Sequence, residues 1–168
     1  MKFKFILTSS LFLLFNATNL SALDAKGFTF SGGIFDTEES TSPVEFGLEY
    51  RLEPRKFNLP LLRKVPLTPA FGVSGTEDGN FWVYTGLRYD WEFSPKWYAT
   101  PQFGISLYED GDGKDLGGVI EFRSGLEISR QFQNGQRLGL LFYHLSNSSI
   151  YEPNPGSNSL VLTYSLGR

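Results

Sequence analysis

Residues 44–52 alternate strictly between apolar and polar side chains, and this pattern constrains the fold more than any other feature of the chain. The even-numbered positions are all apolar, whereas the odd-numbered positions are Glu45, Gly47, Glu49 and Arg51. A period of two places the two sets on opposite faces of a β-strand. The charges are therefore confined to one face of this strand, and the other face is apolar.

The same alternation recurs along the chain and predicts an all-β protein. It is clear at 81–91, 97–107 and 119–129, and weaker copies lie at 27–36, 66–74, 136–146 and 157–167. Together with 44–52 these segments predict eight strands of about ten residues, which is the length that a transmembrane β-strand needs.

Two architectures share this alternation. A soluble barrel buries the apolar face, whereas a transmembrane barrel turns it towards lipid and keeps the charges in the lumen. The even number of strands, their length and the aromatic residues near their ends favour the membrane. We therefore predict an eight-stranded antiparallel transmembrane β-barrel, with a soluble periplasmic lipid-binding barrel as the less favoured alternative. The expected lipid-facing residues are Phe46, Leu87 and Phe122, and the expected lumen residues are Glu45, Arg88 and Glu121.

The start of the chain has the features of a secretory signal peptide. Lys2 and Lys4 precede an apolar core at 5–15, and Leu20-Ser21-Ala22 offers a cleavage site with small residues. That core is too short to cross a bilayer as a helix, which needs about 20 apolar residues. We expect residues 1–22 to be the signal peptide and residues 23–168 to form the barrel domain, which would lie in the bacterial outer membrane.

Composition excludes several classes of function. Removing the expected signal peptide takes away two lysines and no acid, so the formal charge moves from −3 to −5. An acidic domain is not typical of nucleic-acid binding. The chain has no Cys and one His, which excludes disulfides, thiolate metal sites and zinc sites built from several His side chains. We expect no cofactor and no metal.

Short and long connections alternate and orient the predicted barrel. Residues 94–96 and 133–136 are tight turns, whereas 36–43, 75–80, 108–118 and 148–156 are polar loops. Outer-membrane barrels have short periplasmic turns and longer extracellular loops. The polar loops are therefore expected outside. The connection at 54–65 is long for a periplasmic turn and has no explanation in the sequence.

Candidate chemistry lies at the end of the seventh strand. His144 and Ser146 share parity with the apolar residues of 136–146, so both are expected on the outer face, about 7 Å apart at Cα. A base at this spacing can activate a serine. Asn158 has outward parity in the eighth strand, and the intervening loop would bring it near His144. The alternative is that His144 is an ordinary interfacial residue, because a His-x-Ser pattern is weak by itself.

The segment from His144 to Asn158 resembles the active-site segment of PagL-type lipid A 3-O-deacylases. The resemblance rests on His144-x-Ser146-Asn147, on Pro153-Asn154-x-Gly156 and on the strand that follows, whereas the earlier strands match only in pattern. It implies an outer-membrane esterase that removes the 3-position acyl chain of lipid A. Ser146 then corresponds to the nucleophile, His144 to the general base and Asn147 to an oxyanion-hole residue. Outward aromatic residues such as Phe142 and Tyr164 would border the acyl chain.

The sequence departs from this family at one position. Asn158 stands where the resemblance implies the acidic member of the triad. An amide oxygen can orient an imidazole but cannot supply the charge that stabilises imidazolium. Glu152, in the preceding loop, is a candidate for the missing acid.

The sequence therefore predicts a serine-dependent carboxylic-ester hydrolase that acts on lipid A or lipopolysaccharide in the outer leaflet. The main alternative is a catalytically weak or inactive small outer-membrane barrel with a structural or adhesive role. Nucleic acid is not an expected partner, and a homodimer is left open.

Overall fold

The computed structural model describes residues 27–38, 41–59 and 63–166. The expected signal peptide lies outside these residues. The strands are β1 (Phe28–Ile34), β2 (Val44–Arg51), β3 (Arg55–Leu59), β4 (Arg63–Thr76), β5 (Phe81–Arg88), β6 (Trp91–Ser94), β7 (Trp97–Glu109), β8 (Ile120–Gln131), β9 (Arg137–Ser146) and β10 (Ser157–Ser165). Within the described ranges, no helix has the length and apolarity to cross a membrane.

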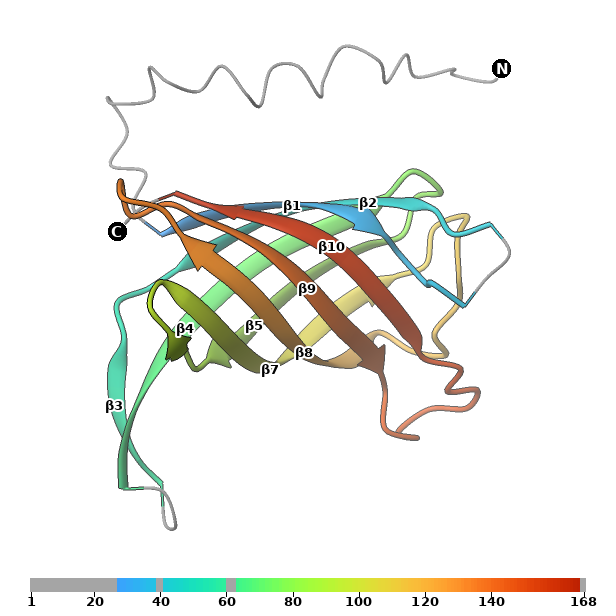
Figure 1. Cartoon of the computed structure of the whole chain (residues 1–168). Coiled ribbons are helices and arrows are strands. Elements are labelled where there is room, and N and C mark those ends of the chain that lie inside the picture. Colours follow the sequence, from blue (N-terminus) through green and yellow to red (C-terminus); the bar gives the residue numbers. More distant parts are fainter. Residues whose placement is uncertain (1–26, 39–40, 60–62, 167–168) are drawn as a thin grey trace.

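Eight of these strands close into an antiparallel barrel, as predicted. The order runs β2, β1, β10, β9, β8, β7, β5 and β4, and pairing of β2 with β4 closes the ring (Figure 1). The two further strands extend barrel strands at the end opposite the polar loops. β3 pairs with the first residues of β4 in a hairpin that projects beyond the barrel wall. This hairpin accounts for the long connection at 54–65.

A proline explains why β5 and β6 are separate strands. The amide of Tyr89 donates to the carbonyl of Pro101 on β7 at 3.1 Å. Pro101 has no N–H to return this bond, so the ladder is interrupted there. β5 ends at Arg88, and pairing with β7 resumes at Trp91. The predicted strand at 81–91 is therefore split at residues 89 and 90.

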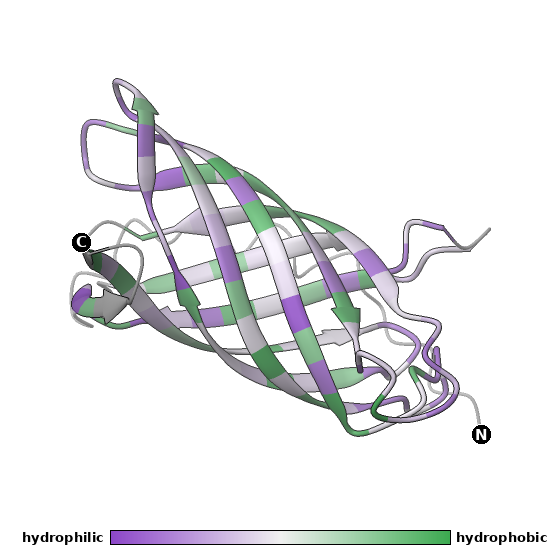
Figure 2. Ribbon diagram, turned by 90° about the horizontal axis from the view of Figure 1, so that it is seen from below, coloured by the Kyte–Doolittle hydropathy of each residue, from purple (hydrophilic) through white to green (hydrophobic). Residues whose placement is uncertain are grey.

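The two faces of the barrel are those expected from the alternation. Phe46 and Leu87 are 42% and 38% exposed, whereas Glu45 and Arg88 are buried in the lumen. Figure 2 shows apolar and polar bands alternating along the strands. The outer wall is apolar and the interior is charged, which is the arrangement of a transmembrane barrel. A soluble barrel with an apolar interior is therefore wrong for this chain.

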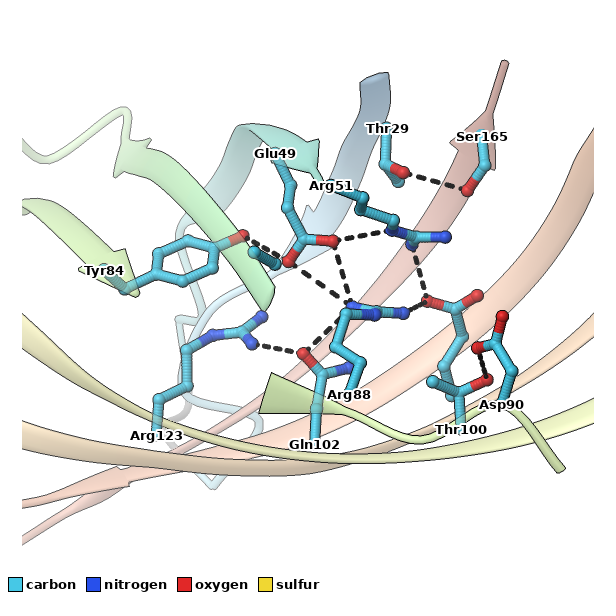
Figure 3. Close-up of polar contacts among 12 residues, drawn as sticks. Thr29, Glu49, Arg51, Tyr84, Arg88, Asp90, Thr100, Gln102, Arg123 and Ser165 are labelled. Atoms are coloured by element: carbon cyan, nitrogen blue, oxygen red, sulfur yellow. Dashed lines mark hydrogen bonds and ion pairs between the residues drawn. The ribbon is translucent and has the colours of Figure 1, made fainter. Parts of the chain in front are cut away.

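Ion pairs cross the lumen and tie distant strands together (Figure 3). Arg88 on β5 lies 2.6 Å from Glu127 on β8 and 3.1 Å from Glu49 on β2. Arg51 pairs with the same two carboxylates. Each of these ions is hydrogen-bonded to an opposite charge, which reduces the free-energy cost of burying it. The lumen is thus a packed polar core.

An apolar cluster lies inside the barrel towards the polar loops. These loops are on the right in Figure 1. Its buried members are Phe35, Trp82, Tyr108, Leu116, Leu141, Tyr143, Leu145 and Val161. Tyr143 and Leu145 come from β9 and are fully buried. The last residues of β9, next to the loops, are therefore anchored from inside the barrel.

Candidate active site

Buried inner neighbours fix the position of the candidate site on β9. Tyr143 and Leu145 point inwards, and the Tyr143 hydroxyl donates to Glu45 across the lumen. Alternation along the strand then directs His144 and Ser146 outwards, where both are half-buried. Side chains on a strand that is packed from behind are held more precisely than side chains on a loop. This confirms the predicted outward direction of both residues.

His144 is bonded to the residue that lies directly opposite it on β10. His144 and Asn158 are register partners, and the imidazole Nδ1 lies 2.8 Å from the amide Oδ1 of Asn158. With the amide in this orientation its carbonyl oxygen only accepts hydrogen bonds, so Nδ1 is the protonated nitrogen. The second ring nitrogen, Nε2, is then unprotonated in the neutral ring. An imidazole in this tautomer can act as a base.

Ser146 lies two residues beyond His144 on the same face of β9. Its register partner on β8 is Phe122. Among the hydrogen bonds of the described residues, none joins Ser146 Oγ to His144. Hydrogen bonds of catalytic groups are often long before substrate binds and shorten in the complex. Ser146 and His144 therefore point the same way at the required spacing, but Ser146 Oγ is not hydrogen-bonded to the imidazole in this structure.

The backbone of Gly156 closes over the imidazole. A Cβ atom on Gly156 would lie 2.8 Å from Cε1 of His144 and 3.3 Å from Nε2. Gly156 also has a φ of +65°, in the left-handed region that favours glycine. This residue therefore limits the movement of the ring on the side of Nε2.

Asn147 is fully buried and joins two loops. Its side-chain amide donates to the carbonyls of Leu116 at 3.0 Å and Pro153 at 3.3 Å. Its backbone amide donates to Oδ1 of Asn154. These bonds fix the loop at 147–156 against the loop at 110–119. A role for Asn147 in an oxyanion hole stays a prediction, because its N–H groups have protein acceptors here.

A carboxylate that the sequence did not indicate lies beside Asn158. The amide Nδ2 of Asn158 donates to Oε1 of Glu38 at 2.7 Å. Glu38 comes from the loop between β1 and β2, 120 residues away in the chain. Glu152, by contrast, is exposed in its loop, and among the described contacts no hydrogen bond joins it to His144. Glu38, Asn158 and His144 thus form a continuous chain of hydrogen bonds on the outer face.

Aromatic side chains extend the apolar wall beside Ser146. Phe122, the register partner of Ser146, stacks on Phe103 with ring centroids 6.1 Å apart. Phe142, two residues before His144, is exposed on the same face. Tyr164 pairs with Leu138 near the opposite end of β9. Phe142 is therefore beside the site as expected, and Tyr164 is distant from it. Phe122, which the sequence indicated only as a lipid-facing residue, lies beside Ser146.

Residues 44–167 match the family model described as lipid A 3-O-deacylase (PagL). The chain belongs to the PagL family. Its sequence is 26% identical over 110 residues to lipid A deacylase PagL of Bordetella bronchiseptica. That alignment covers 60% of this chain and 62% of the relative, so it spans less than two thirds of the relative's length.

Two solved structures share the fold. The crystal structure of the outer membrane enzyme PagL superposes with a TM-score of 0.67 and 17% identity, covering 84% of this chain and 99% of that one. A de novo designed transmembrane β-barrel gives a TM-score of 0.50 and 12% identity, covering 85% of this chain and 97% of the design. The family, the closed barrel and its apolar outer wall together confirm the bacterial outer membrane as the location.

Proposed function

We propose that this PagL-family protein is a serine esterase that removes the 3-O-linked acyl chain from lipid A of lipopolysaccharide. The observation that carries the proposal is the bond between His144 Nδ1 and Asn158 Oδ1, formed on the lipid-facing side of the barrel beside Ser146. It leaves Nε2 as the basic nitrogen, which could take up the proton of a serine. Membership of the lipid A 3-O-deacylase family supports the choice of substrate.

In the first half of the reaction, Ser146 Oγ attacks the ester carbonyl and His144 Nε2 takes its proton. The tetrahedral intermediate then collapses, and the imidazolium gives the proton to the departing sugar oxygen. In the second half, water attacks the acyl-serine with His144 again as the base, which releases the hydroxy fatty acid. Water is the only co-reactant, and no metal or cofactor takes part.

The direction of the site fits a substrate that is itself part of the membrane. His144, Ser146 and Asn158 lie on the outer wall, not in the lumen, so a lipid can approach them sideways. They lie near the loop end of the barrel, where we expect the lipid head groups and the acyl esters of the outer leaflet. Phe122, Phe103 and Phe142 extend the apolar wall next to Ser146 and would contact the acyl chain.

Oxyanion stabilisation needs an N–H donor close to Ser146. We keep Asn147 in this role, acting through its backbone N–H, which would exchange its 3.0 Å bond to Oδ1 of Asn154 for a bond to the substrate oxygen. All of the residues named come from one barrel, so the proposed reaction does not require the homodimer that the sequence left open.

The purified protein, mixed with lipid A in detergent micelles, tests this function. We expect release of one hydroxy fatty acid per lipid A, detected by mass spectrometry, and no release by Ser146→Ala. Heat-dependent gel mobility would show that both proteins are folded barrels. No release by a folded parent protein would contradict the proposal and favour the inactive structural barrel.

A further inference from the structure

We propose that Glu38 is a positioning residue, which fixes the orientation of the Asn158 amide and through it the tautomer of His144. The inference rests on the proposed function, since it assigns a purpose to that tautomer. The observation behind it is the pair of bonds on the two ends of one amide: Oδ1 of Asn158 to His144 at 2.8 Å and Nδ2 to Glu38 at 2.7 Å.

The argument begins with the symmetry of an amide. An asparagine side chain can turn over, exchanging its donor NH₂ for its acceptor oxygen with little change of shape. In the turned orientation Asn158 would donate to Nδ1 of His144. The ring would then carry its proton on Nε2, and Nε2 could no longer accept a proton from the serine. Asn158 alone therefore does not select the active tautomer.

Glu38 removes this ambiguity because an ionised carboxylate only accepts hydrogen bonds. Its oxygen requires the NH₂ group of Asn158 to face it. The amide oxygen must then face His144, and Nδ1 must carry the proton. A directly bonded triad acid achieves the same result in one step, whereas here the carboxylate acts through an intervening amide.

The carboxylate also supplies part of the charge that Asn158 lacks. Two hydrogen bonds and one amide place it roughly 7 Å from the ring. At that distance a unit charge stabilises imidazolium by roughly threefold to fiftyfold between the dielectric of water and that of a protein surface. Glu38 is exposed, so the effect belongs towards the lower end of this range.

Glu38 is carried by an anchored segment. The neighbouring amide of Thr37 donates to the backbone carbonyl of Asn158 at 2.7 Å. Phe35 is fully buried in the apolar cluster, and buried Asp36 forms an ion pair with Lys114. The backbone bond from Thr37 holds this loop on the same residue whose side chain Glu38 contacts. The contact is therefore part of a built connection between the β1–β2 loop and β10.

The experiment uses the fact that His144 is the only histidine in the chain. The full-length mature protein, labelled with ¹⁵N in its imidazole, gives nitrogen signals from this ring alone. At a pH where the ring is neutral, we expect the parent to show protonated Nδ1 and unprotonated Nε2. Glu38→Gln should give a mixture of the two tautomers, because a glutamine can donate as well as accept. Glu38→Asp should restore the parent tautomer, and Glu53→Gln at the other end of the barrel should not change it.

Deacylation rates measured on the same samples complete the test. We expect Glu38→Gln to lower kcat by a factor towards the lower end of roughly threefold to fiftyfold, with little change in KM, and Glu38→Asp to recover most of the loss. An unchanged tautomer in Glu38→Gln would overturn the inference, whatever its activity. If Glu38→Gln changes the tautomer but even the parent protein cleaves no ester, the positioning role is upheld and the proposed function is overturned.

Discussion

His144 on β9 and Asn158 on β10 are register partners whose side chains are joined by a 2.8 Å hydrogen bond. The asparagine thus keeps the orienting contact that the acid of a serine triad provides. The negative charge lies one side chain further along the chain of hydrogen bonds, on Glu38. Geometry and charge, which a triad acid combines, are supplied here by two side chains from different loops and strands. The following predictions test this division and the barrel that supports it.

Ser146→Ala and His144→Ala should each reduce deacylation by several orders of magnitude, because nucleophile and base work as one unit. The double variant should lose little more than either single variant. Rates of fatty acid release measure both effects. Ser149→Ala, in the exposed loop that follows, is the matched control and should keep the parent rate. A double variant whose rate falls by the product of the two single-variant factors would be inconsistent with a shared step.

Asn158→Glu should raise activity most when Glu38 is neutral. In the parent background the new carboxylate would lie beside Glu38, and repulsion between like charges would oppose the gain. Asn158→Glu combined with Glu38→Gln should exceed the parent by about one to three orders of magnitude, part of the factor of about 10⁴ that a triad charge provides. Comparing kcat for the two single variants and the double variant gives the coupling. A double variant slower than the parent would show that the charge is not limiting.

Gly156→Ala should lower kcat in a barrel that is still folded. The added methyl would meet the imidazole of His144 at 2.8 Å and displace it. The matched control is Gly79→Ala, since Gly79 also has a positive φ but offers its Cβ ordinary contact at 3.5 Å. Both variants should lose about 1–2 kcal/mol from backbone strain. Equal kcat values for the two variants would argue against close confinement of the ring.

Leu87→Arg should destabilise the folded barrel by about 2–4 kcal/mol if its outward side chain meets the middle of the bilayer. Leu87 pairs with Phe103, the central residue of β7. Phe93→Arg, near the end of the barrel in β6, should cost about 0–1 kcal/mol. Urea unfolding in lipid vesicles measures both. Free labelling of Leu87→Cys by a membrane-impermeant thiol reagent would contradict the lipid-facing assignment.

Arg88→Met should cost about 3–5 kcal/mol, because it leaves Glu49 and Glu127 buried with one cation fewer. Arg130→Met, on the exposed side of β8, serves as the control and should stay within about 0.5 kcal/mol of the parent. The same unfolding assay applies. Similar costs for the two variants would mean that the lumen ion pairs contribute little to barrel stability.

The sequence predicts the barrel and half of the site, for a physical reason. A period of two is a local signal, so it locates strands and also gives the outward direction of His144 and Asn158. The β3–β4 hairpin has no such signal, because it projects past the barrel and does not separate lipid from lumen. Glu38 is 120 residues from Asn158, and its contact depends on how a loop packs, which no local pattern encodes.

The central claim is that Ser146 and His144 cleave the 3-O-linked acyl chain of lipid A. Mass spectra of lipid A from bacteria that express the parent protein, compared with cells expressing equal amounts of Ser146→Ala, test it most directly. We predict that the parent shifts lipid A to a species lighter by one 3-hydroxyacyl chain, whereas Ser146→Ala leaves the spectrum unchanged. Identical spectra from the two strains, with both barrels folded in the outer membrane, would contradict the account.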